Sequence, residues 1–418
     1  MQTNLADFVK GTREGEEAEA ILRKCVHCGF CTATCPTYQL LGDELDGPRG
    51  RIYLIKQVLE GKRATAKTQT HLDRCLTCRN CETTCPSGVE YGRLIDIGRK
   101  IVGEQVPRGA ADRLARAALA KGLASPLFAP AMRLGQAMRW AVPGALKAKV
   151  PARQAAGVRP APRHARRMLL LEGCVQNAMM PNINNAAARV LDRLGVSLVS
   201  APKAGCCGAL NYHLDFQAAG LDDMRRNIDA WWPLIEVPVG ARADFAPVEA
   251  LAMTASGCGV MVRDYGHLLA HDVAYAAKAA RVSALTRDLS EVVVEEPGLA
   301  PALTAVVGKS GTKIAYHPPC TLQHGQQIRG KAEEVLRDAG FELTPVAESH
   351  LCCGSAGAYS VLNPGIADDL KKRKLANLEA GAPEMILSAN IGCLTHLQSG
   401  TAMPVKHWIE VVDDVLGA

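Results

Sequence analysis

Sixteen cysteines in a regular arrangement constrain this 418-residue chain more than any other feature of its sequence. Eight lie between Cys25 and Cys85, and the other eight recur at wide, matching intervals between Cys174 and Cys393. The polar start of the chain, Met1 to Glu17, has no apolar core of a secretory signal, so we expect a reducing, cytoplasmic location. Cysteines are seldom disulfide-bonded there, and their clustering therefore predicts metal ligands.

The N-terminal eight cysteines form two runs 50 residues apart, CVHCGFCTATCP and CLTCRNCETTCP. Both read Cys-x2-Cys-x2-Cys-x3-Cys-Pro, the spacing of bacterial ferredoxins in which the fourth cysteine of each run ligates the other cluster. Zinc is the alternative, but a zinc ribbon needs two Cys-x2-Cys pairs rather than two runs of four. We therefore expect two [4Fe–4S] clusters, one held by Cys25, Cys28, Cys31 and Cys85 and the other by Cys75, Cys78, Cys81 and Cys35.

Composition excludes several other classes of protein. With 48% hydrophobic and 22% charged residues the chain is globular, and its low aromatic content of 4% argues against stacking on nucleic acid. No apolar run approaches the roughly 20 residues of a membrane span. No Gly-x-Gly-x-x-Gly follows an expected strand, so a dinucleotide fingerprint is missing and the chain alone should not oxidise an organic substrate.

Residues 1–100 are expected to form a helical ferredoxin-like domain, in which a charged turn, Gly42 to Arg51, leads into a helix closed at Gly61. Residues 101–167 carry 13 Lys or Arg against two acids and form a basic helical connector. Two interpretations stay open: a solvated linker, or a surface that docks through Trp140 and Arg163, Arg166 and Arg167 on anionic lipid or an acidic partner.

The rest of the chain is a second duplication, with units at 168–300 and 301–418. Cys174 and Cys320 are 146 positions apart, as are the pairs Cys206–Cys207 and Cys352–Cys353. In both units an apolar run ends at a cysteine, and a helix, a glycine stop and a strand precede Cys-Cys-Gly. Strands that alternate with helices predict mostly parallel sheets, which makes the fold class α + α/β.

In both units, each single cysteine and each Cys-Cys pair falls at the carboxyl end of an expected strand, where open α/β sheets bind ligands. We therefore expect four thiols to converge in each unit, unless they are buried bystanders. The better candidate for a third metal site is Cys320, Cys352, Cys353 and Cys393, and the weaker is Cys174, Cys206, Cys207 and Cys258. The third site is expected to hold iron–sulfur or zinc.

These motifs resemble those of the cysteine-rich (CCG) iron–sulfur subunits, which include heterodisulfide reductase subunits and lactate-utilisation proteins. CVHCGFCTATCPTYQLLGDELDGPRGRIYLIKQVLEG, HLDRCLTCRNCETTCPSGV, NIDAWWP, TASGCG, HLCCGSAG and NIGCLTHL are similar to the glycolate oxidase iron–sulfur subunits of that family. The resemblance implies an electron-transfer subunit of a glycolate dehydrogenase complex. It implies partner subunits that carry FAD and oxidise glycolate to glyoxylate, and an acceptor such as quinone at the cytoplasmic face of the inner membrane.

The sequence departs from the family pattern at two positions. Heterodisulfide reductase ends each unit with Cys-x2-Cys, whereas this chain has Met261 and His396 at the second position. Disulfide-cleaving chemistry on a non-cubane cluster is therefore disfavoured, although His396 remains a possible nitrogen ligand beside its simpler role as a hydrogen-bonded turn residue. His213, His317 and His324 lie near the expected thiol sites and either tune the sulfurs or have structural roles.

Three functions compete on this evidence. The first is electron transfer within a glycolate dehydrogenase, or alternatively within a lactate or glycerol-3-phosphate dehydrogenase. The second is a thiol or quinone reductase that uses the CCG units as its active site. The third is a zinc-stabilised scaffold, which leaves the ferredoxin-type runs unexplained. We expect no nucleic-acid partner.

Overall fold

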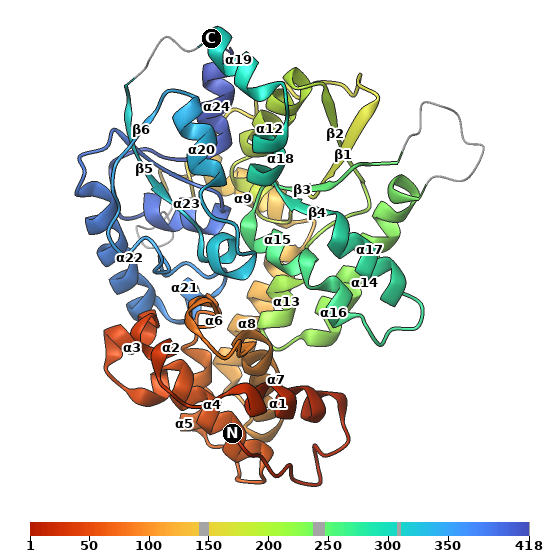
Figure 1. The fold of residues 1–418 in the computed structure, drawn as a ribbon, viewed down its shortest axis with the longest axis vertical. Coiled ribbons are helices and arrows are strands. Elements are labelled where there is room, and N and C mark those ends of the chain that lie inside the picture. The colour runs from red at the N-terminus through yellow and green to blue at the C-terminus, as the bar shows by residue number, and fades with distance from the viewer. Residues whose placement is uncertain (142–149, 237–246, 307–310, 418) are drawn as a thin grey trace.

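The computed structural model describes residues 1–141, 150–236, 247–306 and 311–417. A helical N-terminal layer lies beneath two α/β units that stand side by side, with the N-terminus and the C-terminus at opposite ends of the molecule (Figure 1). Among the helices of these residues, none combines the length and the apolar character that crossing a membrane requires. The arrangement confirms the predicted fold class.

The regular elements described in the N-terminal layer are all helices, as the sequence predicted. Proline at the first position begins α3 and α4, and Gly61, at a φ of 96°, follows the end of α4. The helices pack around a core that includes Ile55, Leu94 and Ile95. The elements are α1 (Arg13–Lys24), α2 (Phe30–Ala33), α3 (Pro36–Leu41), η1 (Glu44–Asp46), α4 (Pro48–Leu59), α5 (Ala66–Asp73), α6 (Asn80–Thr84) and α7 (Tyr91–Gln105).

The basic connector begins with two helices, α8 (Ala110–Ala124) and α9 (Phe128–Ala137), and its residues 142–149 lie outside the described ranges. Several of its arginines bind acids of the folded units. Arg163 pairs with Asp192 at 2.6 Å, and Arg166 contacts Glu249 and Glu296 at 2.8 and 2.7 Å. These ion pairs tie the two arginines to the first unit, and docking through them stays a prediction.

The first α/β unit holds a four-stranded parallel sheet in the order β2-β1-β3-β4. Its strands are β1 (Arg166–Leu170), β2 (Val196–Ser200), β3 (Leu251–Met253) and β4 (Thr286–Asp288). Its helices are α11 (Gln176–Met179), α12 (Asn182–Arg193), α13 (Ala209–His213), α14 (Gln217–Ile235), α15 (Ser256–Arg263), α16 (Tyr265–Leu268), α17 (Ala276–Leu285), α18 (Leu289–Glu295) and α19 (Leu299–Val306).

The second unit repeats this topology with a parallel sheet in the order β6-β5-β7-β8. The equivalent strand orders confirm that the C-terminal part is an internal duplication. The strands are β5 (Lys313–His317), β6 (Glu342–Leu343), β7 (Met385–Ser388) and β8 (Val405–His407). The other elements are the π-helical turn η3 (Thr321–Gly325), α20 (Lys331–Asp338), α21 (Tyr359–Leu362), α22 (Pro364–Glu379), α23 (Ile391–Gln398) and α24 (Trp408–Gly417).

The two units share one hydrophobic core, in which α24 of the second unit packs on α12 of the first. Arg189 of α12 pairs with Asp413 of α24 at 2.6 Å, and the buried His407 contacts the carbonyl of Thr254 at 3.0 Å. Because the sheets are parallel, the carboxyl ends of the strands within each unit meet at one edge. The cysteines of both units follow those ends, as the sequence predicted.

Candidate metal centres

The first expected cluster set occupies one cavity of the N-terminal layer. Cys25, Cys28, Cys31 and Cys85 all line it, together with Cys81 and the aromatic ring of Tyr91. Burial, and then the neighbouring Cys25 thiol, raise the pKa of Cys31 to about 11. Thiols held this close favour a metal, since a bound cation offsets the cost of bringing several thiolates together.

The second expected set comes together beside the first. Cys75 and Cys81 are buried in the helical core, and the electrostatic neighbours of Cys81 include Cys78, Cys75 and Cys35. Burial, and then Cys320 of the second unit, raise the pKa of Cys78 well above its usual value. The fourth cysteine of each run thus lies with the first three of the other run, as the crossed assignment requires.

Hydrogen-bond donors that the sequence did not single out surround the second set. The Tyr91 hydroxyl lies 3.6 Å from Cys75 Sγ, and the hydroxyl of Thr37 lies 3.3 Å from Cys35 Sγ. Arg99, itself buried, donates from Nη2 to the carbonyl oxygen of Cys75 at 2.6 Å. Donors and positive charge around cluster sulfurs stabilise the reduced, more negative state.

Beneath the second set lies a buried polar network in the segment that the sequence suggested as a charged turn. Asp46 and Arg51 are almost wholly buried, and the Asp46 carboxylate contacts Arg74 at 2.8 Å and His71 at 3.0 Å. Arg51 also donates from Nη1 to the Thr37 hydroxyl at 3.1 Å. These buried charges therefore anchor the loop that carries Cys35.

The four thiols of the second α/β unit are buried together. Cys320 Sγ lies 3.8 Å from Cys352 Sγ, and this hydrogen bond, followed by burial, raises the pKa of Cys320 well above its usual value. Cys353 stands between Cys352 and Cys393 in the same chain of sulfur contacts. The backbone N–H of Gly354 donates to Cys352 Sγ at 3.4 Å, and the side-chain amide of Asn390 lies 3.7 Å from Cys393 Sγ.

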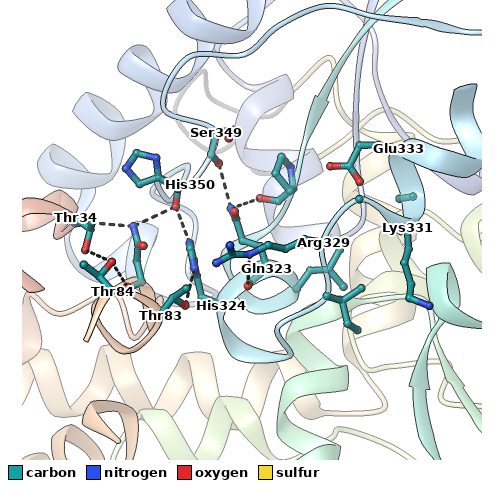
Figure 2. Close-up of a pocket in the computed structure, with 16 residues that line it drawn as sticks. Thr34, Thr83, Thr84, Gln323, His324, Arg329, Lys331, Glu333, Ser349 and His350 are labelled. Carbon is teal, nitrogen blue, oxygen red and sulfur yellow. Dashed lines mark hydrogen bonds between the residues drawn. The ribbon is translucent and has the colours of Figure 1, made fainter. Parts of the chain in front are cut away.

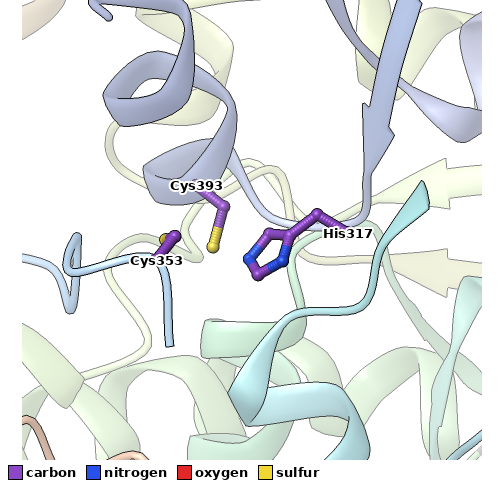
Figure 3. Close-up of side chains that lie close together, drawn as sticks. All are labelled: His317, Cys353 and Cys393. Atoms are coloured by element: carbon purple, nitrogen blue, oxygen red, sulfur yellow. The ribbon is translucent and has the colours of Figure 1, made fainter. Parts of the chain in front are cut away.

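A histidine and a lysine also lie beside the thiols of the second α/β unit, the candidate third metal site. One ring nitrogen of His317 and the sulfurs of Cys353 and Cys393 lie within 4.8 Å of one another, and Figure 3 shows the imidazole facing both sulfurs. Burial lowers the pKa of His317 well below its usual value, so the ring is neutral. Lys374 is 2% exposed and donates from Nζ to the carbonyl of Glu348, which places a cation beside the thiols.

The thiols of the first α/β unit also converge. Hydrogen bonds to Cys174 and Cys207 lower the pKa of Cys206, while the same contacts raise the pKa of Cys174 and Cys207. Cys207 further contacts Cys258. The backbone carbonyl of Cys206 accepts hydrogen bonds from Arg226 and Asn227 at 2.9 and 2.7 Å, which fixes the loop.

The second unit adjoins the second N-terminal set. Cys78 packs against a buried cluster that includes Cys320, Cys352 and Leu76. The side-chain amide of Asn80 donates to the carbonyl of His350 at 3.3 Å, and the hydroxyl of Tyr359 donates to the carbonyl of Arg74 at 3.0 Å. These contacts bring two expected metal sites from distant parts of the sequence against each other.

A cavity of about 500 Å³ opens between the N-terminal layer and the second unit. Figure 2 shows His324 bridging the two, with its ring nitrogens 3.0 Å from the Thr83 hydroxyl and 2.9 Å from the carbonyl of His350. Arg329 and Lys331 also line the cavity, beside apolar groups such as Leu322 and Ile328. A small molecule with hydrogen-bond acceptors would fit these walls.

Two other histidines that the sequence analysis named have hydrogen-bond partners other than sulfur. His213 contacts the carboxylate of Asp96 at 3.3 Å, and His396 is hydrogen-bonded from Nε2 to the carbonyl of Ala367 at 3.2 Å. Met261, at the position equivalent to His396, is buried in the core of the first unit. Of the histidines named in the sequence analysis, the structure places His317 against thiols. Its position at the end of β5, three residues before Cys320, is the sequence feature that pointed to it.

Comparison with known proteins agrees with this architecture. The cysteine-rich domain family matches residues 168–263 and 314–398, and the 4Fe-4S dicluster domain family matches residues 21–89. The chain is 54% identical over 418 residues to the glycolate oxidase iron-sulfur subunit of Escherichia coli, covering 100% of this chain and 99% of that protein. It is 29% identical to a probable glycolate oxidase iron-sulfur subunit of Bacillus subtilis, covering 94% and 91%. Lactate utilization protein A of Bacillus licheniformis is 25% identical over 57% of this chain and 96% of its own length.

Proposed function

Since the chain belongs to the family of glycolate oxidase iron–sulfur subunits, we propose that it carries electrons from glycolate oxidation within a multi-subunit oxidoreductase. Oxidation of the CH–OH group of glycolate to the C=O group of glyoxylate releases two electrons and two protons. A flavin subunit would take the electron pair, and this chain would pass the electrons on one at a time. Iron–sulfur clusters bound to its cysteines supply that one-electron chemistry.

The observation that carries this proposal is the contact between Cys78 and the Cys320–Cys352 pair. It supports a relay from the N-terminal cysteine sets into the second α/β unit. The residues suit the task, because buried thiols bind the clusters while Arg99, Tyr91 and Lys374 place donors or positive charge beside them. These side chains would hold and orient the iron–sulfur clusters and shield them from water.

The test is to combine the anaerobic chain with its flavin partner and glycolate, and to follow bleaching of the iron–sulfur absorption. We expect glycolate to reduce the native chain. We expect Cys28→Ser to stop electron delivery to an added acceptor while the partner's flavin is still reduced. Unchanged acceptor reduction in Cys28→Ser would contradict the proposed route.

A further part of the proposal concerns where the chain docks. Helices α8 and α9 and the turn after them expose Leu114, Leu127, Leu134 and Trp140, with Trp140 83% exposed. Arg113, Lys121 and Arg133 are exposed on the same helices. Apolar side chains interleaved with basic ones suit an anionic lipid surface, where the rings and aliphatic groups insert and the charges meet the headgroups.

A second candidate function is reduction of a quinone-type acceptor by this chain itself. The cavity beside His324 and His350 favours it, because its polar groups could bind carbonyl oxygens near Cys320. A soluble quinone analogue should then protect the cavity residues from hydrogen exchange. Failure of the analogue to bind the reduced native chain would remove this candidate and leave the electron-transfer role intact.

A further inference from the structure

The two α/β units differ in the groups that surround their thiols. Leu171 precedes Cys174 by three positions, and His317 precedes Cys320 by three. Ile228 follows Cys207 by 21 positions, and Lys374 follows Cys353 by 21. Leu171 and Ile228 are buried apolar residues of the first unit's core. The duplication has therefore placed nitrogen-bearing side chains in the second unit at two positions where the first unit has hydrocarbon.

His317 is held rigidly in place. It is the last residue of β5, it pairs in register with Ser388 of β7, and its carbonyl accepts a hydrogen bond from the Ser388 hydroxyl at 2.8 Å. The strand β7 leads directly into α23, which carries Cys393. A ligand fixed on neighbouring strands keeps its geometry better than one on a loop.

The imidazole of His317 is 1% exposed, and neither of its ring nitrogens has a hydrogen-bond partner among the described residues. Leaving a buried polar group unpaired is costly, so an unpaired group of this kind in a folded protein calls for a partner such as a bound ion. The sulfurs of Cys353 and Cys393 are the ligating atoms beside it: these two sulfurs and a ring nitrogen of His317 all lie within 4.8 Å of one another. Two thiolates and an imidazole suit a thiophilic transition metal.

We propose that His317 is a nitrogen ligand of an iron–sulfur centre held by Cys353 and Cys393 in the second α/β unit. The inference rests on the proposed electron-transfer function and names a ligand for its third site. Exchange of thiolate for neutral imidazole raises the potential of an iron–sulfur centre. The second unit then accepts electrons favourably from the N-terminal clusters, whose eight ligands are all thiolates.

The test uses the full chain, purified anaerobically and studied by pulsed electron paramagnetic resonance for nitrogen hyperfine coupling. His317→Leu installs the residue of the first unit, and His396→Met does the same at the other histidine as a matched control. We expect the native chain and His396→Met to show imidazole nitrogen coupling on one centre. We expect His317→Leu to lose it, with or without loss of the centre's iron.

His317→Cys keeps a ligand at the position and guards against simple loss of the site. We expect this variant to retain iron, to lose the nitrogen coupling and to titrate at a lower midpoint potential than the native chain. Absence of nitrogen coupling in the native chain, its persistence in His317→Leu, or zinc bound in place of iron would each overturn the inference. Those results would leave reduction of the N-terminal clusters by glycolate intact, whereas failure of the proposed function would abolish that reduction in the native chain.

Discussion

The hydroxyl of Thr83 lies 3.0 Å from Nδ1 of His324, and this hydrogen bond joins α6, the helix between Asn80 and Thr84 that carries Cys81, to the turn that follows Cys320. Thr83→Val keeps the shape of the side chain but leaves a ring nitrogen of a buried histidine unpaired. We expect the free energy of unfolding to fall by about 1–2 kcal/mol and electron transfer into the second unit to slow. Anaerobic urea denaturation and stopped-flow absorption measure the two effects.

The control for Thr83→Val is Thr70→Val. Thr70 lies on the exposed side of α5, and its hydroxyl bonds only to the Ala66 carbonyl of the same helix in the described structure. The Thr70→Val variant should leave the rate of electron transfer unchanged. Equal transfer rates in both variants would mean that the Thr83–His324 contact does not hold the two sites together.

Tyr91→Phe removes the hydroxyl that lies 3.6 Å from Cys75 Sγ without opening a cavity. Loss of a hydrogen bond to a cluster sulfur destabilises the reduced state. We therefore expect the midpoint potential of one N-terminal cluster to fall while the iron content stays constant. A redox titration followed by electron paramagnetic resonance checks this, with the exposed Tyr53→Phe as control; identical potentials in native protein and Tyr91→Phe would show that the bond has no influence.

We expect acid to weaken the packing between the two α/β units by protonating His407. Burial lowers the pKa of His407 to about 3, although the hydrogen bond to the Thr254 carbonyl opposes this shift. Protonation would also remove the ring nitrogen that accepts a hydrogen bond from the Ile409 N–H. The unfolded chain binds this proton below about pH 6.5, so stability is present above that pH and is lost as pH falls toward 3. Between pH 6.5 and pH 5 the histidine contributes a loss of roughly 2 kcal/mol.

His407→Asn keeps an acceptor for the Ile409 N–H and removes the titrating ring. We expect its free energy of unfolding to decline less between pH 6.5 and pH 5 than that of the native chain. Denaturation curves at both pH values give the comparison. Parallel declines in the two proteins would assign the acid sensitivity to other groups.

The docking surface on α8 and α9 makes a separate prediction. Trp140→Ser combined with Leu134→Ser should reduce co-sedimentation with vesicles that contain anionic lipid, and raised salt should weaken the native interaction because exposed charges are screened within about 10 Å at 0.1 M. Val273→Ser, at a fully exposed apolar position on the first unit, is the control. If the double variant still co-sediments with the vesicles as well as the native chain does, α8 and α9 serve only as a connector.

Local patterns in the sequence were enough to predict much of the fold. The crossed cysteine sets follow from short spacings, and the duplication follows from the 146-residue offset between Cys174 and Cys320. Parallel sheets then place thiols at one edge because strand ends coincide there. The assignments of individual cysteines to metal remain predictions, although the structure groups them as expected.

Long-range packing explains what the sequence did not predict. Arg166 pairs with Glu296, which lies 130 positions away, so no local pattern pointed to this partner. Asp46 is buried by partners that come later in the chain, His71 of α5 and Arg74 directly after that helix. No local pattern shows that Cys78 meets Cys320, since this contact depends on how the N-terminal layer packs on the second unit.

The most direct test of the account is iron per chain in anaerobically purified protein, compared with Cys353→Ala and Cys207→Ala. Four-iron clusters at the two N-terminal sets and at the second α/β unit predict about twelve irons in the native chain, about eight in Cys353→Ala and about twelve in Cys207→Ala. A native count of about eight that stays at eight in Cys353→Ala, with no zinc bound, would contradict the three-centre relay.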